Sequence, residues 1–197
     1  MNPGLSGKPA KQLTPLEDRN LVLIGYRATG KTAVGAALAR ILRRPFVDLD
    51  QVLVAEAGQS VAEIVAQGGW EEFRRREKQL VARYCHPGGQ VLATGGGVVL
   101  DPENVQALQE NGVIIWLTAE PDAIRARLEA DRLRDAFRPS LTGGDPVSEV
   151  LEVLKFREPL YRAAARVIID TTNQSIPQIV QEILETLKLK EAANLGR

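Results

Sequence analysis

The segment from Asn20 to Thr32 limits the possible folds of this chain more than any other stretch of the sequence. It starts with the apolar run NLVLI, passes through a turn that begins and ends with glycine, and opens a run of small and apolar residues at helical spacing that continues to Ile41. A nearly continuous apolar run of this length is typical of a parallel strand covered on both faces. The sequence therefore predicts a buried strand, a tight turn and a helix in immediate succession.

The turn between this strand and this helix has the pattern of a phosphate-binding loop. Residues 25–32, GYRATGKT, match G-x-x-x-x-G-K-[ST]. Glycines let the backbone curl so that its N–H groups converge on phosphate oxygens, and the helix N-terminus adds positive potential. In this pattern Lys31 reaches the β- and γ-phosphates and Thr32 offers its hydroxyl to Mg²⁺. A glycine turn without a ligand is the alternative, and the flanking strand and helix favour the phosphate site. The residues predicted to bind ATP are Gly25, Tyr26, Arg27, Ala28, Thr29, Gly30, Lys31, Thr32 and Ala33.

Apolar runs alternate with helical patterns along the rest of the chain. The further runs occupy residues 44–49, 90–93, 112–117 and 166–170, and the helical patterns cover residues 61–67, 70–84, 102–110, 121–130, 147–165 and 176–189. Strands that alternate with helices indicate an α/β fold with a mainly parallel sheet. We therefore expect a three-layer sandwich, with a central five-stranded sheet and helices on both faces.

Length and composition allow one globular core. A chain of 197 residues with 44% hydrophobic content can bury a single sizeable core. We expect one domain over residues 19–190, a flexible leader over 1–18 and a tail over 191–197. The leader has no apolar core of a signal peptide, and no run approaches the roughly 20 apolar residues that span a bilayer. The expected location is the cytoplasm.

Charge and cysteine content exclude several classes of function. Lysine plus arginine and aspartate plus glutamate both number 25, so the chain lacks the strong positive field that nucleic acids or membrane surfaces usually require. We expect neither partner, and we expect a monomer. Cys85 is the one cysteine and His86 the one histidine, so the chain cannot form an internal disulfide and has no ligand set for structural zinc. We interpret Cys85 as an inert loop thiol.

Two carboxylates, Asp48 and Asp50, close the second predicted strand, RPFVDLD. Alternate positions of a strand point to the same side, and ligands of open α/β sheets collect at this edge. One carboxylate could support hydrated Mg²⁺ and the other could accept a hydroxyl proton from a substrate. The alternative is a helix cap or a solvated pair beyond the strand.

The segment FRRRE, residues 73–77, places three guanidinium groups in a row on a predicted helix, so they cannot all face one ligand. Arg74 and Glu77 share a face because they are three residues apart. A solvated, charged helix face is the default interpretation of such a run.

Three glycines, residues 95–97, follow the predicted strand QVLA and Thr94. They remove every side chain from one patch of backbone, which costs chain entropy unless something must approach closely. A bound ring or phosphate against these peptide groups is favoured over a plain tight turn.

The alternation of strands and helices is interrupted at residues 131–145, DRLRDAFRPSLTGGD, which combine charge, a proline and two adjacent glycines. One interpretation is a solvated loop. The other is a mobile lid that closes over a substrate.

Taken together, these segments resemble the shikimate kinase family. The resemblance extends from about Leu21 to about Leu187, and it is carried by the order and spacing of GYRATGKT, FVDLDQ, FRRRE, TGGG, FRPSLTG and FREPLYR. It implies ATP-dependent phosphorylation of the 3-hydroxyl of shikimate, a step of aromatic amino-acid synthesis. It also implies a P-loop NTPase fold similar to that of the nucleoside monophosphate kinases, with a mobile lid.

The resemblance also implies roles for individual residues. Lys31 and Thr32 would hold the phosphates and Mg²⁺, and Asp48 would assist the metal through water. Asp50 would be the candidate base, and Arg138 in the lid would contact ATP and the transferring phosphate. Thus the implied catalytic residues are Lys31, Asp50 and Arg138. The implied shikimate-binding residues are Asp50, Arg74, Gly95, Gly96, Gly97 and Arg157. Adenine contacts would come from Arg132–Arg134 and Asp170–Asn173.

The sequence departs from the family pattern at two points. Ala28 stands where the family usually has another P-loop glycine, and the lid reads RPSL followed by TGG in place of the commoner RPLL. The alternatives to a shikimate kinase are another small-molecule kinase, such as a gluconate kinase, and a noncatalytic nucleotide-binding module.

Overall fold

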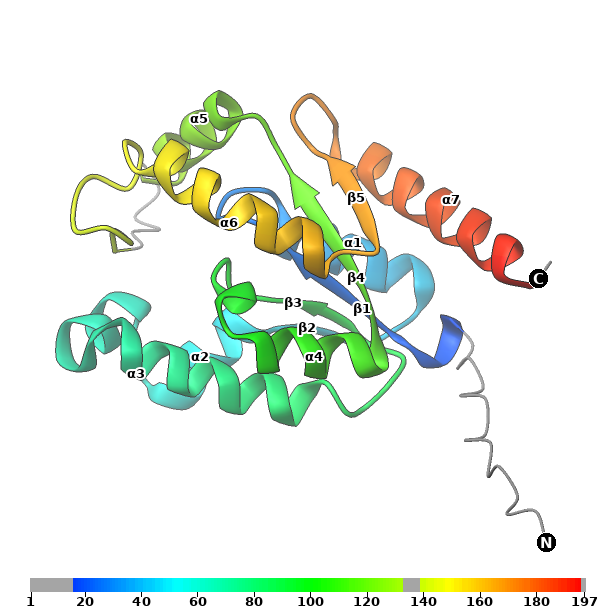
Figure 1. The fold of residues 1–197 in the computed structure, drawn as a ribbon, viewed down its shortest axis with the longest axis horizontal. Coiled ribbons are helices and arrows are strands. Elements are labelled where there is room, and N and C mark those ends of the chain that lie inside the picture. Colours follow the sequence, from blue (N-terminus) through cyan, green and yellow to red (C-terminus); the bar gives the residue numbers. More distant parts are fainter. Residues whose placement is uncertain (1–15, 133–138, 196–197) are drawn as a thin grey trace, which may run out of the picture.

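A five-stranded parallel sheet lies at the centre of the computed structural model, which describes residues 16–132 and 139–195 (Figure 1). The strand order is β2-β3-β1-β4-β5, and every neighbouring pair is parallel. The strands are β1 (Asn20–Ile24), β2 (Phe46–Asp48), β3 (Val91–Ala93), β4 (Gly112–Thr118) and β5 (Val167–Asp170). The predicted five-stranded α/β fold is therefore confirmed.

Helices cover both faces of the sheet, which confirms the three layers. They are α1 (Lys31–Leu42), α2 (Leu49–Ala57), α3 (Val61–Tyr84), α4 (Pro102–Asn111), α5 (Pro121–Arg132), α6 (Val150–Ala164) and α7 (Ile176–Leu195), with short 3-10 turns η1 (Leu16–Asp18) and η2 (Val98–Leu100). In Figure 1, α3, α4 and α6 lie in front of the sheet and α1 lies behind it.

The alternation of β1 explains how one strand serves two cores. Val22 and Ile24 pack in a cluster with residues of α2, α3, α4 and α6, whereas Leu21 and Leu23 pack in a second cluster with residues of α1 and α7. All residues of β1 are buried, as its continuous apolar run predicted. The central strand is thereby fixed in position, and the turn that follows it at Gly25 starts from a rigid base.

Helix α2 was not predicted, and it corrects the interpretation of the aspartate pair. Asp48 ends β2 and caps α2, because its Oδ1 accepts hydrogen bonds from the backbone N–H groups of Asp50 at 3.0 Å and Gln51 at 3.2 Å. Asp50 therefore lies in the first turn of a helix, and the prediction that both aspartates alternate along a strand is wrong. The alternative of a helix cap is the one that the structure has for Asp48.

Helix α3 contains the break that the sequence predicted between two helical patterns. Gly69 has φ 68° and ψ 179°, a conformation outside the helical region, so the segments before and after it differ in direction. The helix begins with a capping box in which Ser60 and Glu63 satisfy each other's backbone N–H groups. The second segment carries Trp70, Phe73 and Arg74.

Cys85 caps the C-terminus of α3 and is buried, and burial raises the pKa of its thiol, which supports the interpretation of an inert thiol. Within residues 16–132 and 139–195, no helix is long and apolar enough to cross a membrane. The domain boundaries predicted at 18–19 and 190–191 stay predictions. In the described part of the chain, η1 begins at Leu16 and α7 continues to Leu195.

Candidate active site

The predicted phosphate-binding loop joins the buried end of β1 to α1. Three of its residues have positive φ angles: Gly25 at 141°, Ala28 at 61° and Gly30 at 93°. A Cβ atom on Gly25 would lie 2.3 Å from the carbonyl oxygen of Leu117, so glycine is required there. Ala28 adopts the left-handed conformation despite its side chain, which explains why a glycine is expected at this position.

Lys31 is folded over this loop. Its Nζ donates hydrogen bonds to the carbonyl oxygens of Gly25 at 2.9 Å and Tyr26 at 2.7 Å, and the residue is only 9% exposed. Thr29 supports the same turn, because its hydroxyl donates to the Tyr26 carbonyl at 2.8 Å. The ammonium group is thus held at the loop, where it can exchange backbone carbonyls for phosphate oxygens.

A pair of oxygen ligands lies at the start of α1. The Thr32 hydroxyl donates to Oδ2 of Asp48 at 2.6 Å, while Oδ1 of Asp48 caps α2. Hydroxyl and carboxylate oxygens suit Mg²⁺, which commonly takes few protein ligands and completes its octahedron with phosphates and waters. Because these two oxygens are beside the phosphate loop, their chemistry fits the predicted metal position.

A cavity of about 480 Å³ opens above the loop. Its lining contains predicted ATP-binding residues together with groups from α5 and from the segment before α6. The lining residues are Arg27, Ala28, Gly30, Lys31, Thr32, Ala33, Asp48, Asp50, Thr94, Arg127, Leu128, Asp131, Pro146 and Val147.

Arg127 is a site residue that the sequence analysis missed. Its guanidinium donates to the Ala28 carbonyl at 3.3 Å, to the Thr171 hydroxyl at 3.1 Å and to the Thr172 carbonyl at 3.1 Å. It thereby joins the phosphate loop to the segment after β5, part of the predicted adenine region. The available signal in the sequence was its spacing of three residues from the apolar Ile124 in the predicted helix at 121–130, because residues at this spacing share a helix face.

A second, much smaller pocket adjoins the first. It holds about 30 Å³, and it brings together every residue predicted to bind the acceptor. Arg27 and Asp50 line both pockets, so the two spaces meet at these side chains. The lining residues are Tyr26, Arg27, Asp50, Val61, Trp70, Phe73, Arg74, Gly95, Gly96, Gly97, Leu141 and Arg157.

An ion pair on α3 forms one wall of this small pocket. Nη1 of Arg74 lies 2.5 Å from Oε2 of Glu77, and the guanidinium is 5.1 Å from the ring centroid of Phe73. Burial raises the pKa of the Glu77 carboxyl, and the Arg74 guanidinium opposes that effect. The pair confirms that Arg74 and Glu77 share one face of α3. Because Glu77 is buried, this face is not the solvated, charged face that was the default interpretation.

The three glycines make room for this ion pair. A Cβ atom on Gly97 would lie 2.0 Å from Nη2 of Arg74, and a Cβ atom on Gly95 would lie 2.4 Å from Oε1 of Glu77. The close approach that the glycines predicted is therefore made in part by the protein's own charged side chains and not by a ligand alone.

Arg157 on α6 faces the same pocket from the other side. It is 7% exposed, its Nη1 donates to the Gly96 carbonyl at 3.2 Å, and its buried Nε has no hydrogen-bond partner in the described parts of the chain. Tyr161, one turn later, donates its hydroxyl to the same carbonyl. Burial raises the pKa of Tyr161 to about 12, so this donor stays protonated near neutral pH.

Arg138, predicted to act from the lid, lies outside the described residues, as does the rest of 133–138. Residues 131–132 end α5, and the described part of the predicted lid resumes at Pro139. Of that part, Leu141 lines the small pocket.

A phosphate loop after the central strand, an oxygen pair for a metal and an adjoining cationic pocket define a P-loop kinase that acts on a small molecule. A sequence model of the family described as shikimate kinase matches residues 27–188. The chain therefore belongs to the shikimate kinase family, and the resemblance seen in its motifs is confirmed.

Individual relatives agree with this assignment. The chain is 46% identical to a shikimate kinase of Symbiobacterium thermophilum over 177 residues, which cover 90% of this chain and 99% of that protein. It is 43% identical to a shikimate kinase 2 of Escherichia fergusonii over 89% of this chain and 96% of that protein. The solved structure of Acinetobacter baumannii shikimate kinase in complex with shikimate has a TM-score of 0.81 and 30% identity, and covers 89% of this chain and 96% of that one.

Proposed function

We propose that this enzyme transfers the γ-phosphoryl group of ATP to the 3-hydroxyl of shikimate, giving shikimate 3-phosphate and ADP. The observation that carries this proposal is the junction of the two pockets at Arg27 and Asp50. Phosphoryl transfer requires donor and acceptor to be held in line, and a nucleotide cavity that opens onto a charged acceptor pocket meets that requirement.

On the nucleotide side, we assign Lys31 to the β- and γ-phosphates and the Thr32–Asp48 oxygens to Mg²⁺. The backbone N–H groups of residues 25–32 would cradle the phosphates, and Lys31 would compensate the charge of the transition state. Magnesium, when bound, would neutralise phosphate charge. The hydrogen bond from Thr32 to Asp48 supports this assignment, because its two oxygens lie 2.6 Å apart and could serve one ion directly or through water.

On the acceptor side, we assign the carboxylate of shikimate to arginine. Arg157 is the stronger candidate because its buried Nε lacks a partner within the described chain, whereas Arg74 is already paired with Glu77. Guanidinium groups match carboxylates with two parallel hydrogen bonds. Asp50, at the junction, would accept the proton of the attacking hydroxyl or orient it.

The acceptor pocket must widen before shikimate enters. Its volume of about 30 Å³ has room for no more than a few water molecules, which is too little for a substituted six-membered ring. Leu141 and Trp70 are among the residues that bound the pocket. Nε1 of Trp70 donates a hydrogen bond to the Ser140 carbonyl at 3.2 Å. The lid over 131–145 and the role of Arg138 remain proposals from the family resemblance, and Arg127 is our candidate for the adenine end of the nucleotide pocket.

An assay of ADP release tests this function directly. Purified protein with ATP and Mg²⁺ is compared with shikimate, gluconate and nucleoside monophosphates as acceptors. We expect shikimate alone to raise ADP release above background hydrolysis, and omission of Mg²⁺ to abolish that increase. Stimulation by another acceptor but not by shikimate would refute the substrate assignment. Light scattering during size-exclusion chromatography tests the predicted monomer.

A further inference from the structure

Glu149 is a buried carboxylate outside every predicted site. It lies immediately before α6 and is 4% exposed, yet its side chain makes no capping hydrogen bond to its own helix. A buried carboxylate is costly unless it is paired and hydrogen-bonded, so its partners indicate what it holds in place.

One oxygen of Glu149 holds the segment that follows the predicted lid. Oε2 accepts hydrogen bonds from the Ser140 hydroxyl at 2.7 Å, the Leu141 backbone N–H at 2.8 Å, and the Thr142 backbone N–H and hydroxyl at 2.9 and 3.1 Å. Because Leu141 lines the acceptor pocket and Ser140 accepts from Trp70, this carboxylate fixes part of the acceptor pocket wall.

The other oxygen faces the phosphate loop. Oε1 lies 3.6 Å from Nη1 of Arg27, and the same Nη1 donates to the Pro139 carbonyl at 3.2 Å. Both side chains are almost completely buried. Arg27 occupies a variable position of the phosphate-loop pattern, so nucleotide binding by the loop backbone does not explain why a guanidinium is placed there.

We propose that Glu149 is a positioning residue for the acceptor site: through Arg27 it joins the phosphate loop to the wall formed by residues 139–142. This inference rests on the proposed function for its kinetic part. Since Arg27 lines both pockets, the link fixes the wall of the acceptor pocket relative to the loop that holds the donor phosphate. Loss of the link is therefore expected to weaken acceptor binding more than the chemical step.

The substitution Glu149→Gln separates the two functions of the carboxylate. Glutamine keeps the volume and one oxygen for the donors of residues 140–142, but it removes the charge that faces Arg27. Arg27→Met removes the guanidinium and keeps an unbranched stem. Each variant is expected to raise the KM for shikimate about tenfold, and in Glu149→Gln kcat and the KM for ATP are expected to change by less than about threefold.

A double-mutant cycle tests whether the two residues act together. The Arg27→Met, Glu149→Gln double variant is expected to raise the KM for shikimate about tenfold, as each single variant does, because one link is lost in all three. The single variant Arg27→Lys keeps the positive charge and is expected to retain most of the shikimate affinity that Arg27→Met loses. Glu152→Gln is the matched control, since it makes the same charge change at an exposed position in the first turn of α6.

Fluorescence tests the link without any substrate. Trp70 contacts the wall that Glu149 holds, whereas Trp116, the other tryptophan, is 3% exposed. Acrylamide quenching of the free protein is expected to increase in Glu149→Gln and Arg27→Met and to stay unchanged in Glu152→Gln. Unchanged quenching in both variants, additive KM effects in the double variant, or losses in kcat and in ATP binding by Glu149→Gln that equal its loss in shikimate binding would each overturn the proposal. If shikimate did not stimulate ADP release by the wild-type protein but the variants showed the expected quenching pattern, the proposed function alone would be refuted.

Discussion

The two adjoining pockets of this enzyme are built in opposite ways. The larger pocket, about 480 Å³ and proposed to bind the nucleotide, is lined on one side by the phosphate loop from Arg27 to Thr32. The smaller pocket, about 30 Å³ and proposed to hold the acceptor, is lined by charged and aromatic side chains from α2, α3, α6 and the phosphate loop, together with the three glycines. Backbone N–H groups suit phosphates, which all nucleotides share, whereas side chains distinguish one small molecule from another. On the proposed assignment, the residues for nucleotide binding lie mostly in one local motif, whereas those for acceptor choice come from distant parts of the chain.

The largest expected effect comes from removing Lys31, the cation held at the phosphate loop. Lys31→Ala is expected to lower kcat by roughly a thousandfold, because the transition state loses a positioned cation. The measurement is ADP release with saturating shikimate. Arg40→Ala, an exposed cation at the end of α1, is the control and should be fully active. Retention of more than about a tenth of the activity by Lys31→Ala would contradict the assignment.

Substitution of an arginine in the acceptor pocket is expected to change mainly the KM for shikimate. Arg157→Ala should raise the KM for shikimate between about tenfold and a hundredfold while the KM for ATP stays unchanged, because a charge-assisted hydrogen bond to the carboxylate is lost. Initial-rate kinetics with each substrate varied in turn make this measurement.

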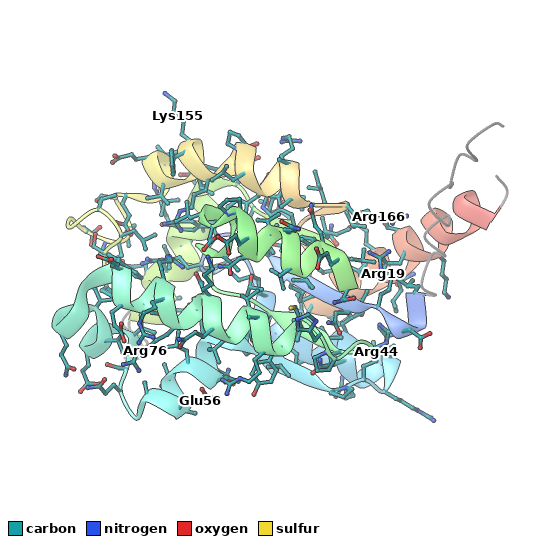
Figure 2. The ribbon with its side chains drawn as sticks, turned by 60° about the horizontal axis from the view of Figure 1, so that its bottom comes forward. Arg19, Arg44, Glu56, Arg76, Lys155 and Arg166 are labelled. Atoms are coloured by element: carbon teal, nitrogen blue, oxygen red, sulfur yellow. The ribbon has the colours of Figure 1, made fainter. Side chains whose placement is uncertain are left out.

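The control for Arg157→Ala is Lys155→Ala, which removes one cation from the same helix. Lys155 is exposed, and Figure 2 shows it pointing away from the body of the protein. If the two variants gave the same kinetics, Arg157 would have no special part in acceptor binding.

A moderate effect on stability is expected from the hydroxyl behind the acceptor pocket. Burial raises the pKa of Tyr161 to about 12 in the folded protein, from the model-compound value of 10.0. The folded state therefore holds the proton more tightly than the unfolded state. The resulting stability is fully present below pH 10 and is lost as the pH rises to about 12, a change of roughly 3 kcal/mol.

Tyr161→Phe is expected to cost about 1 kcal/mol near neutral pH, where the hydrogen bond to Gly96 is lost. It should also remove that part of the alkaline dependence. Urea unfolding of both proteins at several pH values between 8 and about 11 measures the two effects. Parallel pH dependences for wild type and variant would show that the hydroxyl is not held as described.

The smallest expected effect lies in the nucleotide pocket. Ala28 has φ 61°, which costs a side-chain-bearing residue about 1–2 kcal/mol, whereas glycine loses about 0.5–1 kcal/mol through its freer unfolded chain. Ala28→Gly should therefore raise the free energy of unfolding by less than about 1 kcal/mol, with little change in the KM for ATP. A lower urea midpoint for this variant would mean that the methyl group stabilises the loop.

The fold and the nucleotide pocket were predictable because their signals are local. The buried run of β1, the loop glycines and the apolar spacing of α1 follow one another within about twenty residues, and each has a direct mechanical meaning. Helix α2 was missed because it starts directly after β2 without an intervening turn. Asp48 does end a strand, as predicted, but the sequence left a helix cap only as an alternative, and the N–H groups of Asp50 and Gln51 decide for it.

The acceptor pocket was only partly predictable because its supporting contacts join distant residues. The hydroxyl of Tyr161 and the guanidinium of Arg157 reach Gly96 across more than sixty residues of chain. Glu149 and Arg127 look like ordinary charges of helix surfaces in the sequence, and only tertiary packing shows that Glu149 is buried and that Arg127 contacts the phosphate loop. The glycine turn did indicate close approach, but composition cannot show whether a ligand or the protein's own Arg74 approaches it.

The two carboxylate oxygens of Asp48 have different functions, one structural and one proposed to be chemical. One oxygen starts α2, the helix that presents Asp50 to the pocket junction, and the other meets Thr32 at the proposed metal position. Arrival of the ion would thus leave the helix start intact, because the capping oxygen need not be released. An asparagine at this position would have a single side-chain oxygen, so it could either cap α2 or bind the metal, but not both.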